Sequence, residues 1–265
     1  MSCRRLRIRP GTRLSSVDDQ LPVAVLGAAG RMGTTVCQAI EEASDLSLVS
    51  TLDLGDPLSS VIESGAKVAV DFTTPDAVMD NLQFCISAGV HVVVGTTGWG
   101  EERLSTLRGW LAQAPNVGAL IAPNFSLGAV LLMRFAREAA RHFESVEVIE
   151  LHHPDKLDAP SGTARHTAEM ISQVRREADR AAMPDATVDA LSGARGATFE
   201  GVPVHSVRLR GFVAHEEVLL GNPGEVLTLR HDSLDRASFM PGVLLALRSV
   251  GDRPGLTLGL ETLLD

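Results

Sequence analysis

The feature that most constrains the fold of this 265-residue chain is a glycine-rich turn near residue 27, set between an apolar run and a helical pattern. Residues 21–27, LPVAVLG, are continuously apolar and end in glycine, which is typical of a strand buried on both faces of a parallel sheet. Apolar residues at helical spacing follow over 36–43, and residues 46–55 predict a second strand. Strand, helix and strand in this order predict a βαβ unit with a right-handed crossover.

The same alternation continues to about residue 125. The sequence predicts three further strands, each running into a loop, and two helices: strands within 67–73, 90–98 and 117–125, and helices over 74–89 and 100–114. Thr74 followed by Pro75 resembles an N-cap with proline at the first helical position. The fold class expected for this part is α/β, with a Rossmann-like doubly wound parallel sheet.

The pattern changes after residue 125 and predicts a second, α+β domain with a mixed or antiparallel sheet. A long helix, a strand, another helix and three closely spaced strands are expected in turn: 126–143, 145–153, 161–182, 202–211, 214–221 and 225–233. We expect a helix over 235–250 to pack back on the first domain. The predicted division is 21–123 plus 237–265 for dinucleotide binding, and 124–236 for substrate binding and oligomerisation.

Composition excludes several classes of protein. The formal net charge of −9 argues against a nucleic-acid partner, which requires a positive field. No apolar run approaches the roughly 20 residues of a membrane span, so no membrane partner is expected. Cys3, Cys37 and Cys85 are odd in number and lack metal-ligand spacing, which favours free thiols in a reducing cytoplasm and no metal site. The chain has no tyrosine, so a tyrosine acid is excluded.

Residues 1–20 differ from the rest. Arginine occupies five of the first 13 positions and the first acidic residue is Asp18. Because no apolar core is present, this is not a secretory signal. The segment is interpreted as a disordered leader or as the product of an upstream start codon; an organelle transit peptide is the alternative.

The glycine-rich turn is the first candidate binding site. Its glycines have G-x-x-G-x-x-G spacing, a loose form of the dinucleotide-binding pattern, in the strand–turn–helix context that this pattern requires. Such a turn brings backbone N–H groups and the positive end of a helix dipole to a pyrophosphate. A tight turn without a ligand is the alternative. The candidate cofactor contacts in this turn are Gly27, Ala28, Ala29, Gly30, Arg31 and Met32.

Cofactor choice depends on two residues of opposite charge. Asp53 follows the second strand, where an acidic residue hydrogen-bonds a ribose 2′-hydroxyl, and this favours NADH. Arg31 could pair with a 2′-phosphate and admit NADPH. Alternatively, Asp53 caps a loop and Arg31 is solvated.

Two more loops leave the carboxyl ends of predicted parallel strands. In an open α/β sheet such loops line the ligand crevice, so they are candidate walls for the nicotinamide end; otherwise they are ordinary turns. Their candidate cofactor contacts are Gly95, Thr96, Thr97, Ala122, Pro123, Asn124 and Phe125.

The stretch ELHHPDKLDAPSGTA, residues 150–164, gathers the candidate catalytic groups. Histidine suits proton transfer near pH 7, and Lys156 can hold a carboxylate or donate a proton. Ser161 precedes a helical pattern, whose capped N-terminus would direct N–H groups at an anion. The composition suits reduction and protonation of an anionic substrate. In a strand His152 and His153 would face opposite ways, and spacing alone does not say which one is catalytic.

These residues resemble one family. The segments GAAGRMG, VDFTTPDAV, GTTG, APNFSLGA and ELHHPDKLDAPSGTA are similar to those of the 4-hydroxy-tetrahydrodipicolinate reductases, also called dihydrodipicolinate reductases, of the actinobacterial type. The resemblance covers about residues 22–265. The pattern E-x-H-H-x-x-K-x-D-x-P-S-G-T is much more specific than the glycine turn.

The resemblance implies a function and roles for the candidate residues. The expected reaction reduces (2S,4S)-4-hydroxy-2,3,4,5-tetrahydrodipicolinate to tetrahydrodipicolinate with NADH or NADPH and loss of water, in lysine and diaminopimelate biosynthesis. It implies a homotetramer assembled through the second sheet. His152 matches a proton donor/acceptor and Lys156 a proton donor. The expected contacts of the small dicarboxylate substrate are His153, Ser161, Gly162 and Thr163.

Two departures from the family pattern concern the cofactor. Ala29 and Leu54 stand where some members carry basic residues, which weakens a 2′-phosphate site. We therefore expect NADH to serve at least as well as NADPH. Two other readings differ in chemistry: a relative of aspartate or homoserine dehydrogenases, which would oxidise its substrate with NAD, and a dinucleotide-sensing regulator, which would leave His152, His153 and Lys156 unexplained.

Overall fold

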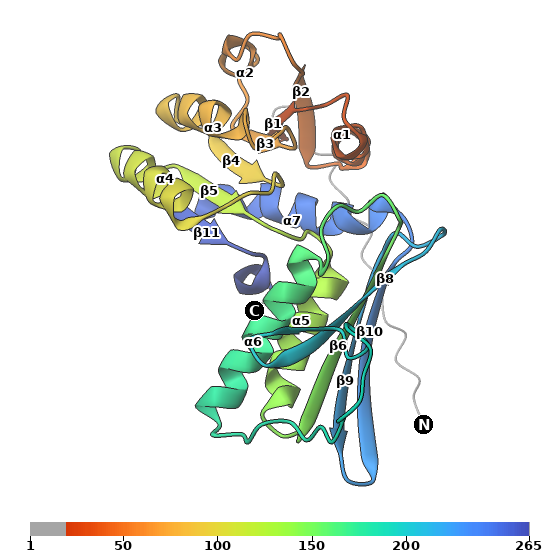
Figure 1. Ribbon diagram of the computed structural model, residues 1–265. Coiled ribbons are helices and arrows are strands. Elements are labelled where there is room, and N and C mark those ends of the chain that lie inside the picture. Colours follow the sequence, from red (N-terminus) through yellow and green to blue (C-terminus); the bar gives the residue numbers. More distant parts are fainter. Residues whose placement is uncertain (1–19, 265) are drawn as a thin grey trace, which may run out of the picture.

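The computed structural model describes residues 20–264, which form two sheets with their helices, the first in the upper half and the second in the lower half of Figure 1. The predicted leader, apart from Gln20, lies outside these described residues. Within residues 20–264, no helix is long and apolar enough to cross a bilayer.

The first sheet has six strands, all parallel, in the order β2-β1-β3-β4-β5-β11. The strands are β1 (Leu21–Leu26), β2 (Leu46–Leu52), β3 (Val68–Asp71), β4 (His91–Val94), β5 (Gly118–Ile121) and β11 (Gly255–Leu258). The helices around them are α1 (Arg31–Glu42), α2 (Ser59–Glu63), α3 (Val78–Ser87), α4 (Glu101–Gln113) and α7 (Met240–Ser249). The chain moves from β1 to β2 in one direction and to β3 in the other, so β1 and β3 flank the point where the strand order reverses. This arrangement confirms the predicted Rossmann-like class.

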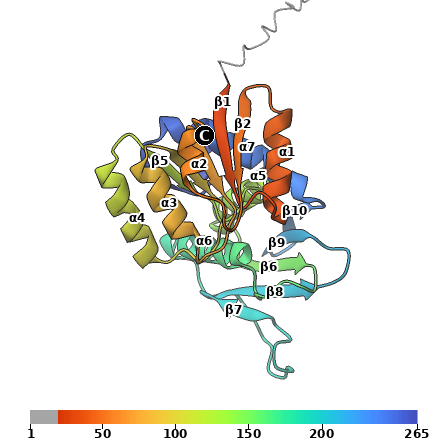
Figure 2. The same ribbon diagram turned by 90° about the horizontal axis from the view of Figure 1, so that it is seen from above.

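Helices cover both faces of the first sheet, which explains its continuously apolar strands (Figure 2). In β1, Val23 and Val25 pack in a cluster that also contains side chains of α1 and α7. Ala24 and Leu26 point to the other face and join a cluster with α3 and α4. The predicted helix over 235–250 is therefore confirmed in its packing: it forms a 3-10 turn (Arg236–Phe239) and α7, and returns to the first sheet.

The second sheet is mixed and is covered by helices on one face only (Figure 1). Its order is β10-β9-β6-β8-β7, with β6 (Ser145–His152), β7 (Ala197–Phe199), β8 (Val202–Arg208), β9 (Ala214–Asn222) and β10 (Glu225–Ser233). Helices α5 (Leu127–Ala140) and α6 (Gly162–Glu177) pack on it. Alternate residues of β6, including Val146, Val148 and Glu150, are buried against this pair.

The expected antiparallel pairing of the three late strands is correct for one pair only. β9 and β10 form a hairpin, but β8 does not pair with β9. Instead β6 lies between them, parallel to β8 and antiparallel to β9. β6 alternates partly exposed and buried residues from Ser145 to Leu151, a pattern that indicates a strand with one covered face but not its place in the strand order.

The predicted start of the helix over 74–89 is also wrong. The carbonyl of Thr74 accepts hydrogen bonds from the N–H groups of Ala77 and Val78, so residues 74–77 form a turn and α3 begins at Val78. Pro75 fixes a backbone angle that suits the second position of such a turn as well as the first position of a helix. The short elements α2, β7 and β11 were not predicted; each has five residues or fewer.

The shape of the glycine turn depends on two of its glycines. Gly27 has a φ of 80°, a conformation that side-chain-bearing residues rarely adopt. Gly33, in the first turn of α1, lies so near that a Cβ there would be 2.0 Å from the carbonyl oxygen of Gly27. The helix can therefore approach the end of β1 only without a side chain at this position.

We expect Gly33→Ala to lower the free energy of unfolding by about 1–3 kcal/mol, because the added methyl group must displace the backbone of Gly27 and Ala28. Urea unfolding of the purified variant measures this loss. Gly109→Ala is the matched control: Gly109 is an exposed position in α4 with no atom near an added Cβ. That variant should gain about 0.5–1 kcal/mol from helix propensity. Equal effects of the two substitutions would contradict the packing role of Gly33.

Candidate active site

A cavity of about 490 Å³ opens at the carboxyl ends of β1, β2 and β3, where the strand order reverses. In open α/β sheets this is where ligands bind. Its lining includes Gly27 and Gly30 of the glycine turn, Asp53 after β2, and Phe72 and Thr73 after β3. Asp53, the candidate ribose contact, thus lies in the wall of this cavity, beside the glycine turn.

The glycine turn leaves the first N–H groups of α1 without a side-chain cap, which fits a pyrophosphate. Helix α1 begins at Arg31, and its N-cap, Gly30, has no side chain to cover the first N–H groups. A Cβ at Gly27 would lie 2.9 Å from the carbonyl oxygen of Phe72, so the turn has no room for one. Asp53 Oδ2 accepts a hydrogen bond of 2.5 Å from the Ala29 N–H. The carboxylate is therefore held against the turn, as a ribose contact would be.

The loops after β4 and β5 are brought together by Phe72, which sequence reasoning did not single out. A Cβ at Gly95 would lie 2.1 Å from the Phe72 ring, and the ring of Phe125 packs against the same ring with centroids 5.7 Å apart. Thr96 is buried and donates from Oγ1 to Asp71 at the end of β3. In these loops Thr97 and Pro123 are exposed, whereas Ala122 and Phe125 are buried.

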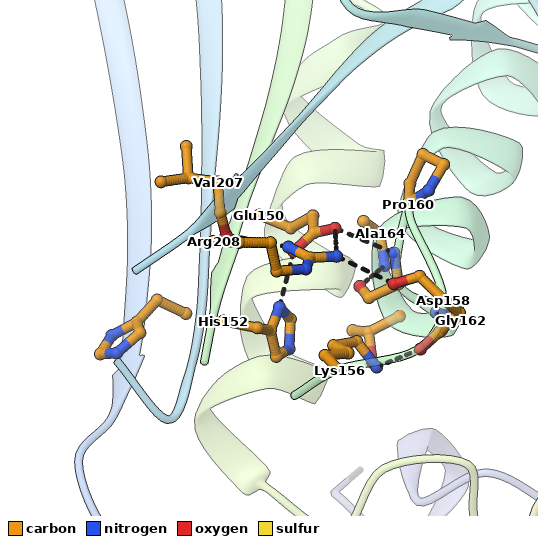
Figure 3. Close-up of polar contacts among 12 residues, drawn as sticks. Glu150, His152, Lys156, Asp158, Pro160, Gly162, Ala164, Val207 and Arg208 are labelled. Carbon is orange, nitrogen blue, oxygen red and sulfur yellow. Dashed lines mark hydrogen bonds and ion pairs between the residues drawn. The ribbon is translucent and has the colours of Figure 1, made fainter. Parts of the chain in front are cut away.

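In the second sheet, the site is built around one fully buried carboxylate, Glu150 (Figure 3). Arg208, at the end of β8, donates to both of its oxygens, with distances of 2.7 and 2.8 Å. His152 Nδ1 lies 2.6 Å from Oε2, and the Ser161 N–H donates to Oε1 at 3.1 Å. Burial raises the pKa of Glu150, but the hydrogen bonds from His152 and Arg208 outweigh it and hold the pKa at about 2.

The ionised state of Glu150 fixes the tautomer of His152. An ionised carboxylate only accepts hydrogen bonds, so Nδ1 must carry a proton. Nε2 is then the nitrogen left to exchange a proton with a ligand. The imidazole is 13% exposed and lines a small cavity of about 30 Å³ together with Asn124 and Thr163.

Lys156 and the first turn of α6 converge on a carboxylate supplied by the chain itself (Figure 3). Asp158 Oδ1 lies 2.7 Å from Lys156 Nζ, and Oδ2 accepts from the Gly162 N–H at 3.1 Å. Burial raises the pKa of Asp158, but the hydrogen bond from Lys156 outweighs it and the pKa is lowered. An ammonium group and a helix-end amide thus already bind one carboxylate in this geometry.

Ser161 and Thr163 lie at the start of α6, and Thr163 connects this site to the loop after β5. Ser161 is the N-cap of α6 and accepts from the Ala164 N–H, as its position before a helical pattern predicts. Thr163 Oγ1 accepts a hydrogen bond of 3.3 Å from Asn124 in the loop after β5. The predicted substrate loop and one of the predicted cofactor loops therefore touch.

The end of β6 decides which of the two adjacent histidines faces the small cavity. The strand stops at His152, and His153 begins the turn in which its carbonyl accepts from the Lys156 N–H. Only His152 is bonded to Glu150 and lines the small cavity. His153 is half-buried beside it, in the turn that carries Lys156.

Sequence reasoning missed Glu150, Arg208 and Asp158 as site residues. Glu150 had a readable signal, because residues two apart on a strand share a face and it precedes His152 by two. Arg208 had none, since its place depends on β8 pairing with β6. Among residues 20–264, no cluster of three or more histidine, cysteine or acidic side chains could hold a metal ion.

The two halves of the chain match two models of one known family. Residues 21–125 match the model of the dihydrodipicolinate reductase N-terminus, and residues 128–264 match that of its C-terminus. The chain belongs to the dihydrodipicolinate reductase family. The resemblance read from the sequence motifs is thereby confirmed.

Curated relatives and a solved structure of the family agree over nearly the whole length. The 4-hydroxy-tetrahydrodipicolinate reductase of Streptomyces avermitilis is 61% identical over 246 residues, covering 93% of this chain and 98% of that protein. That of Cutibacterium acnes is 62% identical, covering 92% and 98%. The dipicolinate-bound dihydrodipicolinate reductase of Paenisporosarcina sp. TG-14 superposes with a TM-score of 0.81 at 38% identity, covering 92% and 99%.

The depressed pKa of Glu150 makes a prediction about stability in acid. Because its folded pKa of about 2 lies below its ordinary value of 4.5, the carboxylate stabilises the fold above pH 4.5. This contribution, about 3 kcal/mol, is lost as the pH falls through the folded value. We expect Glu150→Gln to be destabilised by about this amount at pH 6 and to match the wild type near pH 2. Urea unfolding as a function of pH measures the difference; a difference independent of pH would rule out an ionised Glu150.

Proposed function

We propose that this chain reduces (2S,4S)-4-hydroxy-2,3,4,5-tetrahydrodipicolinate to tetrahydrodipicolinate with NADH or NADPH and loss of water, in lysine and diaminopimelate biosynthesis. The observation that carries the proposal is the convergence of Lys156 and the Gly162 N–H on a carboxylate, beside His152 and in contact with a dinucleotide-type loop. Membership of the dihydrodipicolinate reductase family supports the same reaction.

The division of labour follows the two sheets. We propose that 21–123 plus 237–265 holds the dinucleotide and that 124–236 holds the substrate and forms the oligomer. The bound nucleotide supplies a hydride. The residues proposed to hold it are Gly27, Ala28, Ala29, Gly30, Arg31, Met32, Asp53, Gly95, Thr96, Thr97, Ala122, Pro123, Asn124 and Phe125.

The chain's own groups bind and protonate the substrate. The reaction takes up one hydride and one proton and releases one water molecule. We assign one substrate carboxylate to Lys156 and the N–H groups at Gly162 and Thr163, displacing Asp158, with Ser161 fixing that turn. His152 is the proton donor and acceptor through Nε2, and Lys156 is a proton donor. His153, in the same turn, is assigned to the substrate as well.

The open face of the second sheet supports the proposed homotetramer. Helices α5 and α6 cover one face, and among the described residues no helix covers the other (Figure 1). Partly exposed apolar side chains lie on that open face: Val207 and Val226 are 37% and 71% exposed. A second copy of this sheet, packed face to face, would bury them.

Lys156→Ala tests the catalytic assignment. We expect turnover to fall by about 10²–10⁴-fold, because the variant loses a proton donor and a carboxylate contact. Steady-state oxidation of NADH, measured with the substrate made by a coupled upstream synthase, gives the rate. NADH binding, followed by fluorescence titration, should be unchanged.

The chain offers a matched control, because Lys67 is its only other lysine. Lys67 lies just before β3, at the opposite end of that strand from the cavity. Lys67→Ala should keep the wild-type rate. An unchanged kcat in Lys156→Ala would refute its role.

The cofactor assignment is dual use, with NADH at least as good as NADPH. The Asp53 carboxylate disfavours a 2′-phosphate, while Arg31 at the start of α1 is exposed and able to pair with one. We expect Arg31→Ala to lower kcat/KM for NADPH by about tenfold, the value of one charge-assisted hydrogen bond, with little change for NADH. The ratio of the two kcat/KM values measures this; equal losses with both nucleotides would exclude a selective contact.

A further inference from the structure

A second buried carboxyl group, Glu216, lies across from Glu150 in the same sheet. The two residues are direct partners in the antiparallel pairing of β6 and β9, and both are buried. Glu150 has Arg208 as a counter-ion, whereas Glu216 forms no ion pair within the described part of the chain. Its hydrogen-bond partner is the hydroxyl of Thr167, in α6. Glu216 also lines the small cavity that contains His152 and Thr163.

The hydrogen bonds of Thr167 depend on the protonation state of Glu216. Thr167 Oγ1 lies 2.5 Å from Glu216 Oε1 and 3.1 Å from the carbonyl oxygen of Thr163. A hydroxyl has one proton, so it can donate to only one of these two acceptors. If Glu216 is a carboxylic acid, it donates to Thr167, and Thr167 donates to Thr163. In this arrangement the Thr163 carbonyl accepts a second hydrogen bond besides the one from the Thr167 N–H within α6, and Thr167 Oγ1 both donates and accepts.

The surroundings of Glu216 also favour its neutral form. Burial raises its pKa to about 7, and the negative charge of Glu150 adds to this, against the hydrogen bond with Thr167. The titratable groups around the cavity are His152 on β6, His231 on β10 and His215 on β9 itself. The residues of α5 and α6 that line the cavity, Ala129 and Thr163, are uncharged. Burial lowers the pKa of His231, so that ring does not supply a cation near neutral pH.

We propose that Glu216 is a positioning residue that works as a neutral carboxylic acid: through Thr167 it fixes the first turn of α6, whose amides clamp the substrate carboxylate. The inference rests on the proposed function. Ionised Glu216 would draw the Thr167 hydroxyl proton to itself and leave the Thr163 carbonyl with its backbone bond in α6 alone. It would also place a second negative charge in the wall of a site that receives a dianion. Substrate affinity is therefore coupled to one buried proton.

This role predicts a pH dependence of KM rather than of kcat. If only the protonated form binds the dianion well, the apparent KM is divided by the protonated fraction and rises about tenfold from pH 6 to pH 8. In Glu216→Gln the amide can donate to Thr167 at every pH, so KM should stay near its low-pH value. Thr167→Val removes the linking hydroxyl and should raise KM already at pH 6. Glu169→Gln, which removes an exposed carboxylate from α6, should keep the wild-type profile.

The protonation state itself is measurable without turnover. The infrared difference spectrum of wild type and Glu216→Gln at pH 6 should show the band of a protonated carboxyl group, which disappears by pH 8.5. Stability gives a second readout. Because the pKa is raised in the folded chain, the neutral acid stabilises the fold at low pH, and this is lost as the pH rises from 4.5 to about 7. The melting temperature of Glu216→Gln relative to wild type should therefore increase over this range.

The decisive measurement is the equilibrium binding of dipicolinate, a stable dianion, to the NADH complex of each variant between pH 6 and 8.5. A Kd that rises in the wild type and Glu169→Gln but not in Glu216→Gln supports the proposal. A Kd that rises equally in Glu216→Gln, or no protonated carboxyl band at pH 6, overturns it. A wild type that binds NADH and dipicolinate but reduces no substrate would overturn the proposed function and leave this test intact.

Discussion

The hydrogen bonds to the ionised carboxylate of Glu150 are the interactions on which the site in the second sheet depends. A buried charge costs several kcal/mol unless it is paired and fully hydrogen-bonded. Arg208, His152 and the Ser161 N–H together meet that requirement, and they come from β8, β6 and the start of α6. One buried charge therefore connects an imidazole, the beginning of a helix and two paired strands.

The second requirement is contact between two separately built halves. The first sheet places the large cavity, the proposed nucleotide site, where its strand order reverses. The second sheet places the turn that binds the Asp158 carboxylate at the start of α6. Asn124, in the loop after β5, and Thr163, at the start of α6, join the two. The proposed reduction needs both halves, because we assign the hydride source to the first and the dianion and the proton to the second.

Most of the first sheet could be predicted from the sequence because its signals are local. A continuously apolar strand, a glycine turn and a helical pattern are all contained in residues 21–43, and α1 and β2 form where expected. The errors occur where a local signal is ambiguous or absent. Pro75 suits both a turn and a helix start, and strands as short as β7 and β11 carry too few residues for a periodic pattern.

The sequence by itself determined the fold class, the glycine turn and the presence of His152, Lys156 and a capped helix in one short stretch. Those features depend on backbone propensities and on spacing within a few residues. Only the tertiary structure decided which histidine faces the cavity, and which cation stabilises Glu150. Arg208 is 58 residues away from Glu150 along the chain, and only the pairing of β8 with β6 brings them together. Strand pairing is set by packing of whole faces, which no local pattern encodes.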